Sequence, residues 1–116
     1  MRPLLPILAL IASLAAGSAV AAEAPRGKAV FDLWCGGCHK PLGPYVSSVA
    51  GTSVLERTYK GSKPAALEQR TDLDAATVKL FVRKGSKFMP FFRKTEIGDE
   101  DLEALAAYLA KGPRSE

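Results

Sequence analysis

The sequence predicts a small all-α domain built from three to four short helices and long loops. Three segments repeat apolar residues at the spacing that places them on one face of a helix. No βαβ pattern and no internal repeat is visible. The chain has 116 residues, which corresponds to one domain at most.

The first helix is expected from about Gly27 to Cys38. Its apolar face consists of Gly27, Val30, Phe31, Trp34, Cys35 and Cys38. The stretch from His39 to Leu73 is rich in Gly and Pro and has little periodicity, so it is expected to be mostly loop, with a short helical turn near Ala65 to Arg70. A loop of that length is uncommon in a compact domain and indicates that something besides side chains fills the centre.

The second helix is expected from about Asp74 to Lys84. Asp74 can cap its N-terminus, Leu73 and Val78 can form a hydrophobic staple, and Gly85 can end it. The third helix is expected from about Asp99 to Lys111, with acids in the first turn, where the helix dipole favours them. Its apolar stripe and stop signal are formed by Leu102, Leu105, Ala106, Leu109, Gly112 and Pro113.

The N-terminus has the layout of a secretory signal. A basic start at Met1-Arg2 precedes an apolar run and then small residues up to Ala22. We therefore expect a signal peptide over 1–22, a mature domain over 23–116, and export to a bacterial periplasm without stable membrane insertion after cleavage. An uncleaved N-terminal anchor is the alternative.

Charge excludes one class of partner. Removing residues 1–22, which contain one basic residue, leaves 94 residues with a formal net charge of +3. A nucleic-acid-binding domain of this size is expected to carry a dense Lys/Arg face, so nucleic acid is not expected as a partner.

The chemistry is concentrated in five residues, Cys35-Gly-Gly-Cys38-His39, which contain both cysteines and the only histidine of the chain. This is the attachment signature for a c-type haem. Two thiols three residues apart share one helix face and can add to the two vinyl groups of the porphyrin. His39 can then turn under the ring and bind the iron.

This motif has three alternative interpretations besides haem attachment. A structural zinc site needs about four ligands, and the chain contains no further Cys or His. A thioredoxin-like redox pair is expected near a βαβ pattern. A disulfide between Cys35 and Cys38 leaves the adjacent histidine unexplained.

Met89 is the candidate for the second axial ligand, because the other methionine, Met1, belongs to the expected signal. A thioether is a soft, neutral ligand that raises the reduction potential. Ordinary core packing is the alternative role for Met89, and Lys87 is a remote substitute as ligand. The Pro44 carbonyl is a candidate acceptor for the second ring nitrogen of His39, or Pro44 is a simple turn residue. Candidate partners for the haem propionates are Tyr59, Lys60, Arg57 and Trp34.

These residues resemble a class I cytochrome c. The resemblance covers nearly all of the mature chain and includes the segments Gly27-x-x-x-Phe31, Cys35 to His39, Gly43-Pro44, Met89-Pro90 and Leu105-x-x-Tyr108. It implies that the first and last helices cross, with the glycine allowing close approach, and that the fold wraps around one covalent haem. It implies a one-electron carrier with no catalytic residues of its own.

A finer resemblance is to the cytochrome subunits of p-cresol methylhydroxylase and eugenol hydroxylase-type flavocytochromes. It rests on Cys35 to Pro41, the Gly-Pro pair, and Met89-Pro-x-Phe92. It implies a FAD-containing, phenol-oxidising protein partner, with para-alkylphenols as that partner's substrates. The segment from Ala50 to Leu73 looks longer than in those subunits.

Two other functions remain in competition. A free soluble shuttle to a terminal oxidase or reductase is the first, and a haem sensor or enzyme with an open iron site is the second. Basic residues near the methionine segment suggest a contact patch for an acidic partner, although scattered lysines are usually a solvated surface. They are Arg83, Lys84, Lys87, Arg93 and Lys94.

Overall fold

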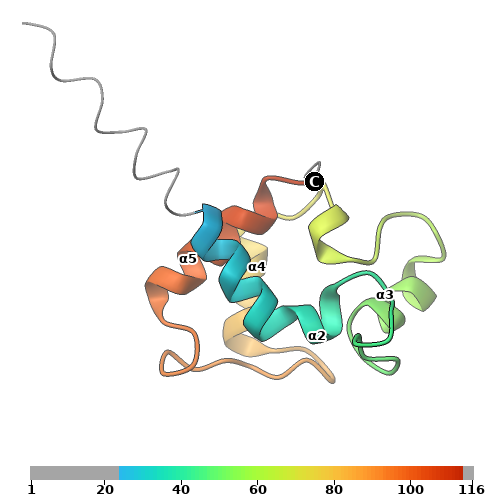
Figure 1. Cartoon of the computed structure of the whole chain (residues 1–116), viewed down its shortest axis with the longest axis horizontal. Coiled ribbons are helices and arrows are strands. Elements are labelled where there is room, and N and C mark those ends of the chain that lie inside the picture. Colours follow the sequence, from blue (N-terminus) through green and yellow to red (C-terminus); the bar gives the residue numbers. More distant parts are fainter. Residues whose placement is uncertain (1–23, 114–116) are drawn as a thin grey trace, which may run out of the picture.

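The computed structural model describes residues 24–113, and in this range the fold is all-α, as predicted. A helix over 24–30 continues through a π-helical turn, η1 (Phe31–Cys35), into α2 (Gly36–His39). The remaining elements are α3 (Thr52–Tyr59), the 3-10 turn η2 (Leu67–Gln69), α4 (Ala75–Lys84) and α5 (Asp99–Ala110). Figure 1 shows the first helix crossing α5, with α4 behind them and α3 apart on the other side of the molecule.

The crossing of the first helix with α5 is unusually close. A Cβ at Gly27 would overlap the backbone carbonyl of Ala104 and would lie 2.6 Å from the Cβ of Tyr108. Only glycine allows this approach. One turn further along, the rings of Phe31 and Tyr108 pack with their centroids 6.1 Å apart. The predicted helix crossing is therefore confirmed.

The core lies where the first helix, α4 and α5 meet. Phe31, Ile97 and Leu105 are completely buried there. They pack in one cluster with Val30, Cys35, Val78, Val82, Leu102, Ala106, Tyr108 and Leu109. Apolar residues spaced along one face of each helix supply this cluster, which is the pattern that the sequence predicts.

The predicted ends of α4 and α5 agree with the structure to within one residue. The Thr77 N–H donates to Asp74 Oδ1 at 2.7 Å, so Asp74 caps α4. Leu73, just before the cap, packs against the core cluster that contains Val78. Gly85 ends α4 with a φ of 67°, a left-handed conformation that favours glycine. The predicted turn near residues 65–70 is also present, as η2.

The expectation that residues 39–73 are mostly loop is wrong in one respect, because α3 lies within this stretch. Its N-terminus has no side-chain cap, and it starts after Gly51, whose φ is 59°. The helix is held by contacts with α2, which are distant in sequence and leave no local pattern.

The predicted signal over 1–22 lies outside the described residues. Within residues 24–113, none of the helices has the length and apolar character needed to cross a bilayer.

Candidate functional site

Cys35, Cys38 and His39 lie on one continuous helical segment, at the point where its geometry changes. The Gly36 N–H donates to the Phe31 carbonyl, which is the longer repeat of a π-helix. Single π turns of this kind occur mostly at functional sites. Phe31 and Cys35, at the two ends of this turn, are buried, and Cys38 and His39 follow on α2.

The two thiols are unpaired and lie in different environments. Cys35 is buried, and this burial, together with the neighbouring Cys38, raises the pKa of its thiol to about 12. Cys38 is only partly buried. Cys35 therefore faces the core, while Cys38 is accessible from outside.

His39 contains an unsatisfied polar atom. Its Nδ1 is buried and has no hydrogen-bond partner within the described residues. Burial also lowers the pKa of the imidazole, which favours the neutral form that binds metal. The structure does not show the expected bond from His39 to Pro44, which is exposed.

The loop after His39 is fastened to the helix that carries the cysteines. The Ser47 N–H donates to the Gly37 carbonyl at 2.8 Å, and the Thr52 hydroxyl donates to the Lys40 carbonyl at 2.7 Å. Gly51 lies so close to the Cys38 carbonyl that a Cβ there would overlap it. Sequence reasoning missed Thr52 and Gly51, because a single Gly-Thr pair in a Gly-rich stretch is no signal by itself.

Met89 lies in a tight turn directly after α4. The Ser86 and Met89 backbones bond to each other in both directions, at 3.0 and 2.8 Å, with Lys87 between them at a φ of 52°. A Cβ on Gly85 would lie 2.6 Å from the Met89 carbonyl, so the turn folds back onto the end of the helix. Met89 is partly buried, and its backbone is fixed on both sides.

Phe92 connects the methionine segment to the cysteine segment. Its N–H donates to the Val82 carbonyl at 2.7 Å, and its ring meets the Trp34 ring edge-on at 5.8 Å. Phe92 also packs against the core cluster that includes Cys35. Through Phe92, the structure brings the methionine segment and the cysteine segment into contact, although more than 50 residues separate them in the sequence.

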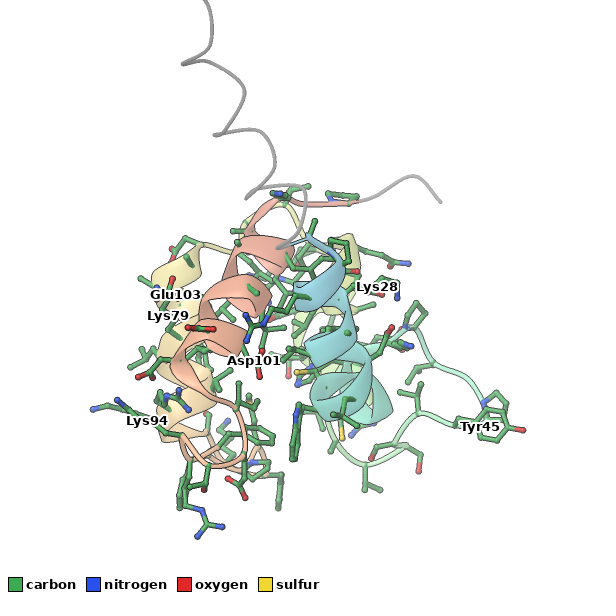
Figure 2. The ribbon with its side chains drawn as sticks, turned by 60° about the vertical axis from the view of Figure 1, so that its left-hand side comes forward. Lys28, Tyr45, Lys79, Lys94, Asp101 and Glu103 are labelled. Atoms are coloured by element: carbon green, nitrogen blue, oxygen red, sulfur yellow. The ribbon has the colours of Figure 1, made fainter. Side chains whose placement is uncertain are left out.

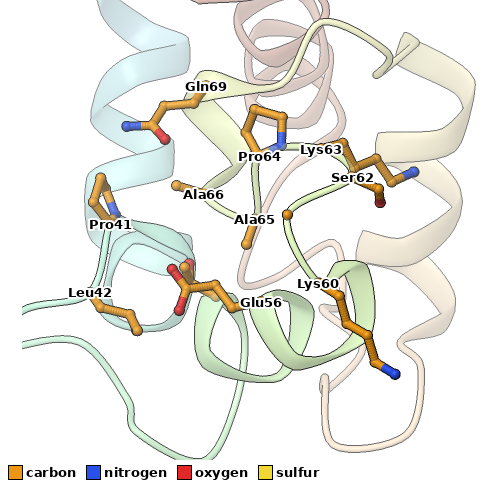
Figure 3. A pocket seen from close by; sticks show the side chains of 12 residues that line it. Pro41, Leu42, Glu56, Lys60, Ser62, Lys63, Pro64, Ala65, Ala66 and Gln69 are labelled. Carbon is orange, nitrogen blue, oxygen red and sulfur yellow. The ribbon is translucent and has the colours of Figure 1, made fainter.

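A cavity of about 730 Å³ opens beside the segment that follows His39 (Figure 3). Pro41 and Leu42 line it on one side, and the buried Ala65 and Ala66 line it on the other. The other lining residues are Thr52, Glu56, Lys60, Gly61, Ser62, Lys63, Pro64 and Gln69. Cys35, Cys38, His39 and Met89 do not line this cavity.

The basic residues near the methionine segment fall into two groups. Arg83 and Lys94 both bind Asp99, at 3.0 and 2.9 Å, and Arg93 binds Glu96 at 3.3 Å. Lys84 and Lys87 form no ion pair within the part of the chain that the structure describes. Five exposed apolar residues accompany them: Trp34, Leu80, Phe81, Phe88 and Phe91.

Comparisons with known proteins show which family the chain resembles. The model of the family described as cytochrome C oxidase, cbb3-type, subunit III matches residues 22–109. The chain is 34% identical over 101 residues to the cytochrome c subunit of the hydroxylating 4-cresol dehydrogenase of Pseudomonas putida. That alignment covers 86% of this chain and 73% of the relative. No solved structure gave a significant match.

Proposed function

The chain belongs to the cytochrome c family and is an electron-carrying haem protein, and we propose that one haem is attached covalently at Cys35 and Cys38 with His39 and Met89 as axial ligands. When bound, the haem supplies a centre that gains and loses one electron. The residues of the chain hold this centre, exclude water from it and guide the redox partner.

The main support for this proposal is the arrangement of the two thiols and the histidine in the Cys35–His39 segment. Two unpaired thiols lie three residues apart on a helical segment, next to a histidine whose buried Nδ1 has no partner within residues 24–113. A histidine that binds metal through one nitrogen needs its second nitrogen oriented by an acceptor.

Two observations support Met89 as the second ligand. Its backbone is held in a tight turn against Gly85, and Phe92 fixes the same segment against Trp34. A soft thioether held by such a turn provides the neutral sulfur ligand typical of high-potential carriers.

The test of attachment is a denaturing gel stained for haem. Thioether bonds survive acid extraction, so haem should remain on the wild-type polypeptide and be lost from the Cys35→Ala, Cys38→Ala double variant. Haem that extracts freely from the wild type would contradict covalent attachment.

The chain is further proposed to work in the periplasm as the electron-accepting subunit of a FAD-containing protein that oxidises para-alkylphenols. The support is its similarity to the cytochrome c subunit of a 4-cresol dehydrogenase. Co-expression with neighbouring genes should yield a stable complex that contains flavin, in which phenol oxidation reduces this cytochrome. A monomer reduced only by respiratory donors would contradict the subunit role.

A second candidate function is delivery of electrons to an oxidase or reductase by a free shuttle. The family description, which names a subunit of a cytochrome c oxidase, supports the link to an oxidase. Mixing the reduced protein with membranes that contain a terminal oxidase distinguishes the two roles, because only the shuttle is reoxidised rapidly.

The surface proposed to meet the partner consists of Lys84, Lys87, Phe81, Phe88 and Phe91. Phe88 is 84% exposed and Phe91 is 61% exposed, which is unusual for phenylalanine. Because Arg93 and Lys94 are already bound to acids, the two uncompensated lysines are the stronger attraction for an acidic partner. Attraction of this kind acts mainly on the rate of association and weakens beyond a Debye length of about 8 Å at physiological salt.

Charge reversal tests this surface. The Lys84→Glu, Lys87→Glu variant should be reduced more slowly by the partner at low salt, with an unchanged haem spectrum. The matched comparison is between the single variants Lys87→Glu and Lys111→Glu, which change the net charge equally, because Lys111 follows the far end of α5, a helix about 18 Å long, from the methionine segment. Equal slowing by Lys111→Glu would indicate an effect of net charge alone.

A further inference from the structure

The segment that contains Met89 joins α4 to α5 over residues 85–98 and runs along the lower edge of the view in Figure 1. The turn between Ser86 and Met89 fixes its start. From residue 90 to residue 93 the chain has no regular structure. The position of this part therefore depends on individual hydrogen bonds and side-chain contacts.

Phe92 is the point at which α4 holds this part of the segment. The Phe92 N–H donates to the Val82 carbonyl at 2.7 Å, and the Phe92 carbonyl accepts a hydrogen bond from Arg83 Nη1 at 3.1 Å. Two consecutive residues in the last turn of α4 thus bind both backbone polar groups of Phe92. Since Phe92 follows Met89 by only three residues, these bonds limit how far the methionine can move.

Arg83 makes a second contact with the same guanidinium. Its Nη2 donates to Asp99 Oδ1 at 3.0 Å, and Asp99 is the first residue of α5. One side chain therefore connects the end of α4, the methionine segment and the start of α5. A guanidinium is planar and rigid, so two acceptors bound to it are also fixed relative to each other.

Two other basic residues of the segment are placed differently. Arg93 binds Glu96 within the segment itself, and its side chain is 70% exposed, whereas that of Arg83 is 23% exposed. Lys94 binds the other carboxylate oxygen of Asp99 and extends outward from the helices (Figure 2). Exposed ion pairs contribute little to stability, and partly buried ones are screened less by salt. Arg83 is therefore the stronger constraint on the methionine segment.

We propose that Arg83 is a positioning residue for the axial ligand, because its guanidinium holds the Phe92 carbonyl between α4 and α5 and thereby keeps the Met89 thioether in place. This inference rests on the ligation by Met89 proposed above and adds the residue that maintains it. An external ligand can reach the iron only where the thioether has moved away. The bonds of Arg83 should therefore oppose ligand exchange.

The test measures how tightly imidazole binds to the oxidised, haem-loaded protein. Binding is followed by the loss of the weak methionine–iron charge-transfer band near the red end of the visible absorption spectrum. Arg83→Met keeps an apolar stem and removes both donors. Loss of a hydrogen bond from a charged group changes an equilibrium about tenfold or more, so this variant should bind imidazole about tenfold more tightly than the wild type.

Two controls separate positioning from charge and from overall stability. Arg93→Met removes the same charge at a residue closer in sequence to Met89, and it leaves the bonds of Phe92 intact. Asp74→Ala weakens α4 at its opposite end, where Asp74 caps the helix. Both should bind imidazole as the wild type does under conditions in which they remain folded. Equal tightening in Arg83→Met and in either control would overturn the proposal.

Arg83→Lys decides the matter if Arg83→Met fails to fold or to retain haem. It keeps the charge, but a single ammonium does not reproduce the rigid geometry of the guanidinium, so imidazole should still bind more tightly than in the wild type. Wild-type affinity in Arg83→Lys would show that charge alone is sufficient and would overturn the proposal. Absence of the methionine–iron band from the wild type would instead contradict the ligation by Met89, and the role of Arg83 would fail with it.

Discussion

At the scale of single residues, the glycine at the helix crossing is the most constrained position in the fold. A Cβ at Gly27 would overlap the Ala104 carbonyl, which belongs to the backbone of α5 and cannot rotate away. Any side chain there must push the two helices apart, and Phe31 and Tyr108 would lose their contact.

Gly27→Ala should lower the free energy of unfolding by about 1–3 kcal/mol, the usual cost of overpacking a core. The control is Gly98→Ala, because the nearest heavy atom to a Cβ at Gly98 is 3.9 Å away. The measurement is chemical denaturation of both haem-loaded variants, and similar small losses would contradict the close crossing.

A second prediction at this scale concerns Met89. If its thioether binds the iron, Met89→Ala should lower the reduction potential, because a soft neutral ligand is lost. It should also abolish the weak methionine–iron charge-transfer band near the red end of the visible absorption spectrum of the oxidised protein. The control is Phe88→Ala, which changes the adjacent exposed residue. A high-spin wild-type protein that binds carbon monoxide readily would show that Met89 is not the ligand.

At the scale of elements, local signals predicted three of the helices and missed the fourth. Asp74, Gly85 and the acids that begin α5 act within one turn of the chain, so the sequence displays them directly. The start of α3 depends on Gly51 meeting Cys38 and on Thr52 bonding to Lys40, twelve or more residues away. The π turn at Phe31–Cys35 also escaped prediction, because the apolar spacing of this segment fits an ordinary α-helix.

The candidate site also has parts that local sequence signals predict and parts that depend on distant contacts. Cys35, Cys38, His39 and Met89 were predicted as site residues from spacing and elimination alone. The orientation of His39 and the choice among propionate partners depend on how distant loops fold, and the predicted bond to Pro44 is not present.

The contribution of the Thr52–Lys40 hydrogen bond to the stability of α3 can be measured by replacing two threonines of this helix in turn. Thr52→Val leaves the Lys40 carbonyl without its donor in a part-buried site, so it should lower the free energy of unfolding by about 1–3 kcal/mol. Thr58→Val is the matched control, because its hydroxyl donates only to the exposed Val54 carbonyl of its own helix. Equal effects in denaturation experiments would show that the bond to Lys40 does not anchor the helix.

The cap of α4 predicts a pH dependence. Hydrogen bonds from the Thr77 N–H and hydroxyl lower the pKa of Asp74. An acid whose pKa is depressed by folding stabilises the protein above its unfolded pKa of about 3.9, and this contribution is lost as the pH falls through the folded value.

Asp74→Ala should therefore be less stable than the wild type at pH 7, and the difference should shrink in acid. Asp74→Asn keeps a capping side chain that does not titrate, so it should lose less stability than the wild type between pH 7 and pH 3. Thermal unfolding of the three proteins at both pH values measures this, and parallel pH profiles would contradict it.

At the scale of the whole molecule, acids and bases pair between helices while apolar surface stays uncovered. Arg26 binds Glu100 and Asp101, which ties α5 to the first helix. Lys79 binds Glu103, which ties α5 to α4 (Figure 2). Leu80, Phe81, Phe88 and Phe91 remain exposed, and Tyr45 projects from the loop after His39 (Figure 2). The protein chain alone therefore makes a thin core.

The haem should complete this core, because small domains often need a bound group or cross-link besides their side chains to be stable. The Cys35→Ala, Cys38→Ala variant should unfold without a cooperative transition, whereas the haem-loaded wild type should show a sharp one. The measurement is urea denaturation followed by circular dichroism. A cooperatively folded variant without haem would show that the polypeptide core is sufficient.

The crossing at Gly27 also determines when the domain can close during biosynthesis. The partners of Gly27 and Phe31 are Ala104 and Tyr108, close to the end of the described chain, so the first helix finds its packing only after nearly everything else has been made. Until then Cys35 is not yet in the core that raises its thiol pKa to about 12 and suppresses its reactivity. The order of synthesis thus leaves an interval in which the Cys35 thiol is not yet buried, whereas Cys38 stays partly exposed after the last helix has packed.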